Sequence, residues 1–240
     1  MTRDFFQLFP RKSIIGMIHL AGFDRREKVR RALEEISLFE DEGIHGAIVE
    51  DYHGSSEEVE EVLNLLAVRK NRPVVGVNVL RDPWLGLSLA NLYGAKFVQF
   101  DTINSPDVDS GYFARYRAEF PDIAILGGVR FKYIKPTGRS LEEDITEGMS
   151  RCEAIVTTGE GTGIETPTQK LKDFRNIMGN RFPLVVGAGV NPGNLQEQME
   201  ICDSAIIGSY FKNGHTKDKV YSERVREIMK VFGSLADKTG

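Results

Sequence analysis

Short apolar runs alternate along this chain with longer segments that carry apolar residues at helical spacing. Each run has the length and composition of a buried strand, and the intervening segments place residues such as Val59, Val62 and Leu66 on one helical face. The last segment, 222–232, is expected to form a helix that packs on the sheet through Val225 and Ile228. The pattern predicts strands over residues 14–20, 46–50, 74–80, 97–101, 123–129, 154–158, 184–188 and 204–209.

This alternation of strand and helix predicts an α/β fold with parallel strands. Each repeat spans on the order of 20 to 32 residues, which is enough for a helical crossover, and no long polar linker interrupts the series. At 240 residues the chain has the length of a one-domain barrel. We therefore expect a single (β/α)8 TIM barrel over 1–240, with residues 1–12 as an N-terminal extension and 14–232 as the barrel. An open doubly wound sheet uses the same alternation and is the alternative fold.

Composition and charge narrow the class of partner. A formal net charge of -4 argues against a nucleic-acid-binding surface, because such surfaces carry basic patches. No apolar stretch reaches the roughly 18 residues of a membrane span, and the amino end lacks the uninterrupted apolar core of an export signal. Cys152 and Cys202 belong to no disulfide or metal-binding pattern. We expect a reduced, cytoplasmic protein without nucleic-acid or membrane partners.

Two glycine-containing turns near the carboxyl end give the strongest chemical signal. Gly187-Ala-Gly-Val-Asn-Pro192 and Ile206-Ile-Gly-Ser209 each close an apolar run. Glycine lets the backbone approach an anion closely, and in (β/α)8 barrels the loops after strands 7 and 8 often bind phosphate. Asn191 is expected to cap the following helix and Pro192 to begin it, while ordinary strand-to-helix turns are the alternative for either turn alone. The predicted phosphate-binding residues are Gly187, Gly189, Val190, Gly208 and Ser209.

Polar residues also follow the other apolar runs, at the ends of the strands where the active sites of barrels lie. Ordinary loop composition is the alternative explanation for such residues. From these positions we predict a catalytic set of His19, Glu50, Asp101 and Lys132. The predicted substrate-binding residues are Asn78, Arg81, Asn104, Arg130, Thr158, Gly159, Thr162 and Gly163.

The acidic and imidazole side chains of this set suggest proton transfer. His19 could act as a general acid or base, with a structural role as the alternative. Glu50 and Asp51 alternate in direction along a strand, and Glu50 is expected to face the barrel axis. Glu50 and Asp101 could divide acid and base roles or bind Mg²⁺, because carboxylate oxygens suit that ion. No motif requires a metal or any other cofactor.

The basic and glycine-rich candidates suggest anion binding. Arg130 and Lys132, two residues apart, are expected to share a face, and Lys132 could clamp an anion or act as a Schiff-base nucleophile. A solvated loop is the alternative for both. The stretch from Gly159 to Gly163 lacks the order of a dinucleotide-binding loop, and the P-loop pattern is absent, so neither NAD binding nor triphosphate hydrolysis is predicted.

Four aromatic residues bear on oligomeric state. Tyr93, Tyr112, Phe113 and Tyr116 could form the seam of a homo-oligomer or lie under neighbouring helices. Packing within the chain is the expectation, because aromatic side chains contribute most often to a core.

Several motifs, in order along nearly the whole chain, resemble those of the BtpA family. They are Gly16-Met-Ile-His-Leu20, Ile48-Val-Glu50, Gly76-Val-Asn-Val-Leu-Arg81, Val156-Thr-Thr-Gly159 with Thr162-Gly163, Val186-Gly-Ala-Gly-Val190 and Ile207-Gly-Ser-Tyr-Phe-Lys212. The resemblance implies a ribulose-phosphate-binding type of TIM barrel and a phosphorylated ligand. The family is named for a member associated with photosystem I biogenesis and also occurs among sugar-utilisation genes, so the resemblance implies no settled reaction.

The chain departs from that family pattern at three places. The fifth strand reads Gly128-Val-Arg-Phe-Lys-Tyr133 where the family carries Asp-Val-His-Val-Lys-His, the fourth reads Gln99-Phe-Asp101 in place of Arg-x-Asn, and Ala21-Gly-Phe-Asp-Arg25 replaces a proline-rich loop. We expect an enzyme of sugar-phosphate or nucleoside metabolism, of isomerase, lyase or glycosyl-transfer type, acting on a small phosphorylated ligand. A non-catalytic phosphometabolite-binding or assembly protein is the alternative, and the fifth-strand departures favour it.

Overall fold

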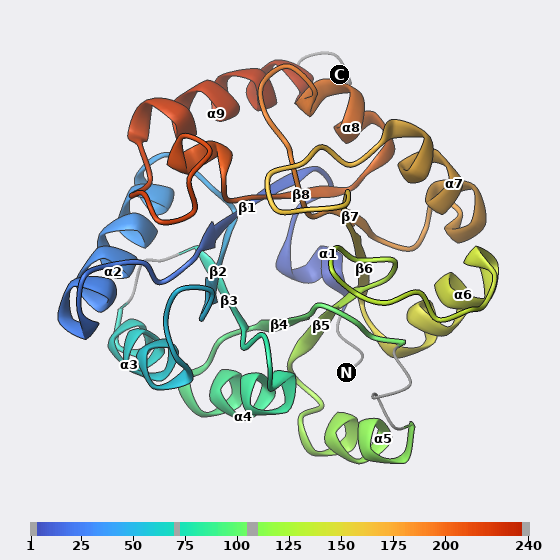
Figure 1. The fold of residues 1–240 in the computed structure, drawn as a ribbon, viewed down its shortest axis with the longest axis horizontal. Helices are drawn as coiled ribbons and strands as arrows, with labels where there is room; N and C mark the ends of the chain where they lie inside the picture. Colours follow the sequence, from blue (N-terminus) through green and yellow to red (C-terminus); the bar gives the residue numbers. More distant parts are fainter. Residues whose placement is uncertain (1–3, 70–72, 105–109, 237–240) are drawn as a thin grey trace.

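Eight parallel strands close into a barrel in this computed structural model, which describes residues 4–69, 73–104 and 110–236 (Figure 1). Each strand pairs with the next and β8 pairs with β1, so the predicted (β/α)8 barrel is confirmed. The predicted strands are found, and each ends at most two residues before its apolar run does. The strands are β1 (Ser13–Ile18), β2 (Gly46–Glu50), β3 (Val74–Asn78), β4 (Phe97–Phe100), β5 (Ala124–Gly128), β6 (Ala154–Thr157), β7 (Leu184–Val186) and β8 (Ser204–Ile207).

A ring of helices surrounds the barrel (Figure 1). Asp24 and Asp82 accept hydrogen bonds from N–H groups in the first turns of α2 and α4, which fixes where these helices begin. The predicted last helix is present as α9. The outer helices are α2 (Arg25–Asp41), α3 (Ser56–Ala67), α4 (Pro83–Tyr93), α5 (Ser110–Glu119), α6 (Leu141–Arg151), α7 (Thr168–Met178), α8 (Leu195–Ile201) and α9 (Ser222–Ala236), with a short 3-10 helix η1 (Tyr210–Lys212) before α9.

The strands bury both faces, as the apolar runs require. One face packs against the helices, and the other fills the barrel interior with alternate residues such as Ile15, Met17 and Ile48. Phe97 occupies space inside the barrel that Gly76 leaves free, because a Cβ on Gly76 would lie 2.3 Å from the Phe97 ring. A tightly packed interior leaves room for a ligand only at an end of the barrel.

The described part of the predicted N-terminal extension packs into the barrel. Residues 5–8 form helix α1 (Phe5–Leu8), and Phe5 and Phe9 are 1% exposed. The Phe9 ring lies 5.4 Å from that of Phe97, edge to face. Because Phe97 begins β4, this segment covers the amino ends of the strands. The carboxyl ends are the other end of the barrel, where the predicted site residues lie.

The four aromatic residues considered for an oligomer seam contact other parts of the chain. Tyr112 and Tyr116 pack on Trp84, with ring centroids 5.2 and 4.8 Å away, and Phe113 is buried. The Tyr93 hydroxyl donates to Glu60 Oε1 at 2.8 Å. These contacts agree with packing within the chain.

Among the helices of the described residues, none combines the length and the apolar composition needed to cross a bilayer.

Candidate functional site

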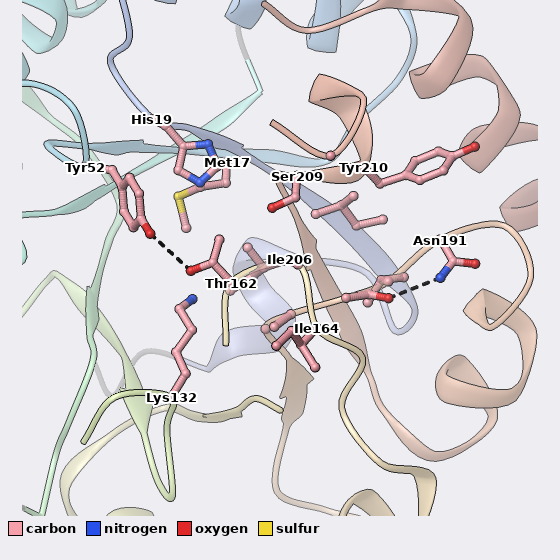
Figure 2. A pocket seen from close by; sticks show the side chains of 18 of the residues that line it. Met17, His19, Tyr52, Lys132, Thr162, Ile164, Asn191, Ile206, Ser209 and Tyr210 are labelled. Atoms are coloured by element: carbon pink, nitrogen blue, oxygen red, sulfur yellow. Dashed lines mark hydrogen bonds between the residues drawn. The ribbon is translucent and has the colours of Figure 1, made fainter. Parts of the chain in front are cut away.

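A cavity of about 460 Å³ lies at the carboxyl ends of the strands (Figure 2). The loops that follow β1, β2, β5, β6, β7 and β8 contribute to its lining, as does α9 through Arg224. Two kinds of surface meet in it. The turns after β7 and β8 expose backbone, and the residues at the ends of β1 and β2, with Lys132, contribute polar side chains.

The two glycine turns lie side by side at this cavity, because β7 and β8 are neighbours that pair through Val186 and Ala205. All of the predicted phosphate-binding residues line it: Gly187, Gly189, Val190, Gly208 and Ser209. Among the hydrogen bonds found for the described residues, none uses the backbone N–H groups of Gly189, Val190, Gly208 or Ser209, whereas that of Gly187 donates to Thr157 O at 2.9 Å. Free amides are what an oxyanion needs from a backbone cradle.

Glycine is required in both turns for steric reasons. Gly189 has φ +71°, and a Cβ there would lie 2.3 Å from the backbone of Glu165 in the loop after β6. A Cβ on Gly208 would lie 2.7 Å from His19 Cε1 and 3.1 Å from Met17 Cβ. A side chain at either position therefore collides with a neighbouring loop or strand.

The expected helix start after the first turn is wrong. The helix α8 begins at Leu195, with Asn194 rather than Asn191 at its N-cap. The Asn191 side chain instead accepts a hydrogen bond from Gly193 N–H at 2.9 Å, and the Asn191 N–H donates to Asn194 Oδ1 at 2.8 Å. Asparagine stabilises such a local turn as readily as it caps a helix, so the chain makes one further turn before α8.

The predicted catalytic carboxylates Glu50 and Asp101 are linked through Asn78. Asn78 Nδ2 donates to Glu50 Oε1 at 2.8 Å and to Asp101 Oδ1 at 3.1 Å, and Gln99 Nε2 donates to the same Asp101 oxygen at 2.9 Å. Only Glu50 of these residues lines the cavity. We call Glu50, Asn78, Gln99 and Asp101 the acid-amide network.

Glu50 accepts a hydrogen bond in this network and is mostly protonated at neutral pH. Burial, followed by the charge of Asp101, raises the pKa of Glu50 to about 8, which Lys132 and the Asn78 hydrogen bond only partly oppose. Asp51 points elsewhere, because its Oδ1 accepts a hydrogen bond from Leu80 N–H at 3.0 Å. The alternation along β2 thus directs Glu50 to the cavity, in agreement with the prediction.

The donor set between the two carboxylates does not fit a metal ion as it stands. The Asn78 NH₂ group donates to an oxygen of each carboxylate, where a cation would need acceptors. Among the described residues, no cluster of three or more histidine, cysteine, aspartate or glutamate side chains is arranged to hold a metal. The acid-amide network is therefore a hydrogen-bonded array rather than a set of metal ligands.

His19 and Lys132 are the remaining predicted catalytic residues, and both line the cavity. His19 Nε2 lies 3.7 Å from Glu50 Oε2. Burial, with the charges of Lys212 and Lys132, lowers the pKa of His19 well below 6.5, so the imidazole is neutral at neutral pH. Figure 2 shows the Lys132 ammonium group pointing into the cavity, toward Thr162.

Several predicted substrate-binding residues lie outside the cavity lining. Arg81 is exposed, and Asn104 Nδ2 donates to Asp144 O at 2.9 Å. Thr158 Oγ1 accepts from Lys132 N–H at 2.7 Å, and a Cβ on Gly159 would lie 2.5 Å from Glu165 O, so both support loops. Thr162 and Gly163 do line the cavity.

Arg130 and Lys132 do not share a face, contrary to the expectation. Arg130 Nε pairs with the buried carboxylate of Asp144 at 2.5 Å, while Lys132 lines the cavity. The reason is local: β5 ends at Gly128, and Arg130 has φ +51°, a left-handed conformation that ends the two-residue alternation of a strand.

The sequence interpretation missed Tyr52 and Arg224. The Tyr52 hydroxyl lies 3.3 Å from Thr162 Oγ1, and its ring packs edge to face on His19, with centroids 5.2 Å apart. Tyr52 follows Glu50 by two residues, a spacing that could have indicated it. Arg224 lies on α9, and its guanidinium donates to Tyr210 Oη and Asn213 Oδ1 at 3.1 and 2.9 Å. No local pattern marks a cavity residue on an outer helix.

Three solved structures illustrate how widely the fold of this chain is shared. The structure described as native KDPGal has a TM-score of 0.69 at 12% identity, covering 98% of this chain and 100% of that one. Thiamine phosphate pyrophosphorylase from Pyrococcus furiosus has a TM-score of 0.65 at 14% identity, covering 94% and 96%. Phosphoribosyl anthranilate isomerase from Thermotoga maritima has a TM-score of 0.62 at 14% identity, covering 92% and 99%. Such low identities establish the shared barrel fold alone.

Sequence relatives span nearly the full chain. An uncharacterized protein of Archaeoglobus fulgidus is 28% identical over 91% of this chain and 98% of its own length. An uncharacterized protein of Pyrococcus furiosus is 25% identical over 95% of this chain and 97% of its own. The family model described as the BtpA family matches residues 10–233. The chain therefore belongs to the BtpA family.

Proposed function

We propose that the protein is an enzyme that acts on a phosphorylated sugar or a nucleotide-like phosphate ester. One observation carries this proposal: the turns after β7 and β8, whose backbone N–H groups at Gly189, Val190, Gly208 and Ser209 donate to no described residue, line the same cavity as Glu50, His19 and Lys132. The amides would hold the phosphate, and the side chains would surround the reacting end of the ligand. The names of two structural neighbours, thiamine phosphate pyrophosphorylase and phosphoribosyl anthranilate isomerase, support a phosphorylated ligand.

The side chains around the reacting end are suited to proton transfer. Glu50, whose pKa is about 8, would donate a proton, and the neutral imidazole of His19, 3.7 Å away, would accept one. Lys132 would stabilise negative charge at this end of the substrate during the reaction. Isomerase, lyase and glycosyl-transfer reactions all include such steps, and the proposal covers these three classes.

Activity is tested by a turnover screen of phosphorylated sugars and nucleotides, with and without Mg²⁺. His19→Ala and Lys132→Ala are expected to lower kcat at least 100-fold for any compound converted, as estimated from the roughly 10²- to 10⁴-fold contribution of a positioned acid or base. A converted compound whose turnover neither substitution changes would contradict these roles.

Phosphate binding is tested at the glycine turns. Gly208→Val puts a branched side chain against His19 and into the cradle, so affinity for a phosphate ester should fall at least tenfold, while far-UV circular dichroism stays that of a folded barrel. Gly233→Val is the matched control, because Gly233 lies exposed on α9 with open space around it. Equal affinities of the two variants would refute the site.

A second candidate function is binding without catalysis, in support of metabolite sensing or of the assembly of a protein complex. One observation favours it: Arg130 pairs with Asp144, so among the described residues Lys132 is the one cationic side chain that the end of β5 brings to the cavity. Tight binding of a phosphate ester that is never converted in the screen would select this function over the first.

A further inference from the structure

We propose that the ligand carries a carboxylate at the end opposite to its phosphate, and that Lys132 binds this carboxylate. The inference rests on the proposed function, because it assumes that the phosphate occupies the glycine turns. It narrows the substrate class to phosphorylated sugar acids and related phosphorylated hydroxy acids.

Among the described residues, none forms an ion pair with the Lys132 ammonium group. The contacts of the described residues include no hydrogen bond or ion pair for Lys132 Nζ, which lies 4.7 Å from the centroid of the Phe131 ring, above its face. The ammonium group projects into the cavity rather than into solvent around the barrel (Figure 2). A cation in a partly enclosed site favours an anionic ligand, because the ligand displaces water from the ammonium group and supplies a counterion.

The other positive charges near the cavity are already used. The Arg224 guanidinium donates to Glu227, Tyr210 and Asn213. Lys212 is 1% exposed, does not line the cavity, and donates to Met17 O at 2.6 Å. Lys132 is thus the cation within the described cavity lining that remains to bind a ligand.

The neighbouring acids do not neutralise Lys132 either. Asn78 donates a hydrogen bond to Glu50 Oε1, and burial raises the pKa of Glu50 to about 8, so this carboxyl is mostly protonated at neutral pH. Asp101 faces Asn78 and Gln99 behind it. The lining at this end of the cavity therefore presents the Lys132 ammonium beside a largely protonated Glu50, while Asp101 lies outside the lining.

The groups around Lys132 suit a carboxylate better than a second phosphate. Figure 2 shows the Tyr52 and Thr162 hydroxyls beside the Lys132 ammonium, with Ser209 and Asn191 on the far side of the cavity. One ammonium and one or two hydroxyls match the two oxygens of a carboxylate. A phosphate dianion calls for more donors, such as the amides that the glycine turns supply.

The test uses pairs of compounds that differ only in the carboxylate. Glycerol 3-phosphate is compared with 3-phosphoglycerate, and ribitol 5-phosphate with 5-phosphoribonate, by titration calorimetry at pH 7. In at least one pair the wild-type protein should bind the acid roughly 10- to 100-fold more tightly, the range expected for a charge-assisted hydrogen bond. Lys132→Met should abolish this preference and leave the affinity for the alcohol phosphates within about twofold.

Lys135→Met is the matched control, because Lys135 lies exposed in the same loop and does not line the cavity. It should keep the preference in full. A wild-type protein that binds both members of each pair equally would overturn the inference while the proposed phosphate site stands. If Lys132→Met weakened the affinity for both compounds of a pair to the same extent, the inference would also be overturned, because Lys132 would then bind the phosphate. Failure of all four compounds to bind would overturn the proposed function together with the inference.

Discussion

The end of the barrel at the carboxyl ends of the strands has two halves, one that offers backbone groups and one that offers side chains. The turns after β7 and β8 offer backbone amides, and their geometry depends on residues that lack a side chain. The ends of β2, β3 and β4 offer the acid-amide network, whose geometry depends on hydrogen bonds between side chains. An amide cradle has a fixed charge distribution at every pH, whereas a buried carboxylate changes charge with pH. We therefore expect the glycine half to set where a ligand binds and the acid-amide half to set the pH dependence.

The acid-amide half gives the largest expected effect. Glu50→Gln keeps the shape of the side chain and an oxygen for Asn78 but removes the ionisation. The folded pKa of Glu50 is raised from 4.5 to about 8, so the folded protein retains a proton that the unfolded chain releases in this window. Glu50 therefore stabilises the fold most below pH 4.5, and this contribution is lost as the pH rises through about 8.

Urea unfolding across this window measures the difference between the two proteins. The free energy of unfolding of the wild type should fall relative to that of Glu50→Gln by roughly 4 kcal/mol between the two ends of the window. Parallel profiles would mean that Glu50 ionises in the fold as it does in water. The acid-amide half would then be no more sensitive to pH than the glycine half.

The glycine half should respond to volume and backbone conformation instead of pH. Gly189→Ala forces an L residue into φ +71° and puts a methyl group 2.3 Å from the backbone of Glu165. We expect a loss of about 3 kcal/mol of unfolding free energy at every pH tested, from left-handed strain and overpacking together. Gly233→Ala is the control: on an exposed helical turn it should stabilise the protein by up to about 1 kcal/mol. If the loss of unfolding free energy in Gly189→Ala depended on pH, the glycine half and the acid-amide half would not differ in the way proposed.

The glycine half was largely predictable because its signal is local. Gly187 and Gly208 lie near the ends of apolar runs and Gly189 directly follows one, and the succession of eight runs places their turns on adjacent strands. The start of the next helix was missed, since Asn191 can form a turn or a cap with the same side chain. Which amides remain free for a ligand depends on hydrogen bonds to other strands, as for Gly187, and no pattern within one strand reports those bonds.

For the acid-amide half, the sequence predicted individual residues but not the hydrogen bonds that join them. Alternation along β2 selects Glu50 over Asp51, but the bridging role of Asn78 depends on the register that pairs it with Glu50 across β2 and β3. The network also needs the inward direction of Asp101 and Gln99, which follows from the closed barrel. Sequence could therefore name the chemical groups, while their partners and their pKa values required the packing of neighbouring strands.

Arg130 lies where the chain leaves β5, between the two halves, and gives the smallest expected effect. Arg130→Met removes one partner of the buried Asp144 carboxylate, which keeps Arg139 at 3.3 Å. We expect a loss of about 2 kcal/mol of unfolding free energy, less than for a fully unpaired buried charge, measured by urea unfolding. Affinity for a phosphate ester should change less than about twofold, because Arg130 does not line the cavity. A tenfold loss of affinity at unchanged stability would place Arg130 beside Lys132 on the ligand, and this end of the barrel would then have a third, cationic part at β5.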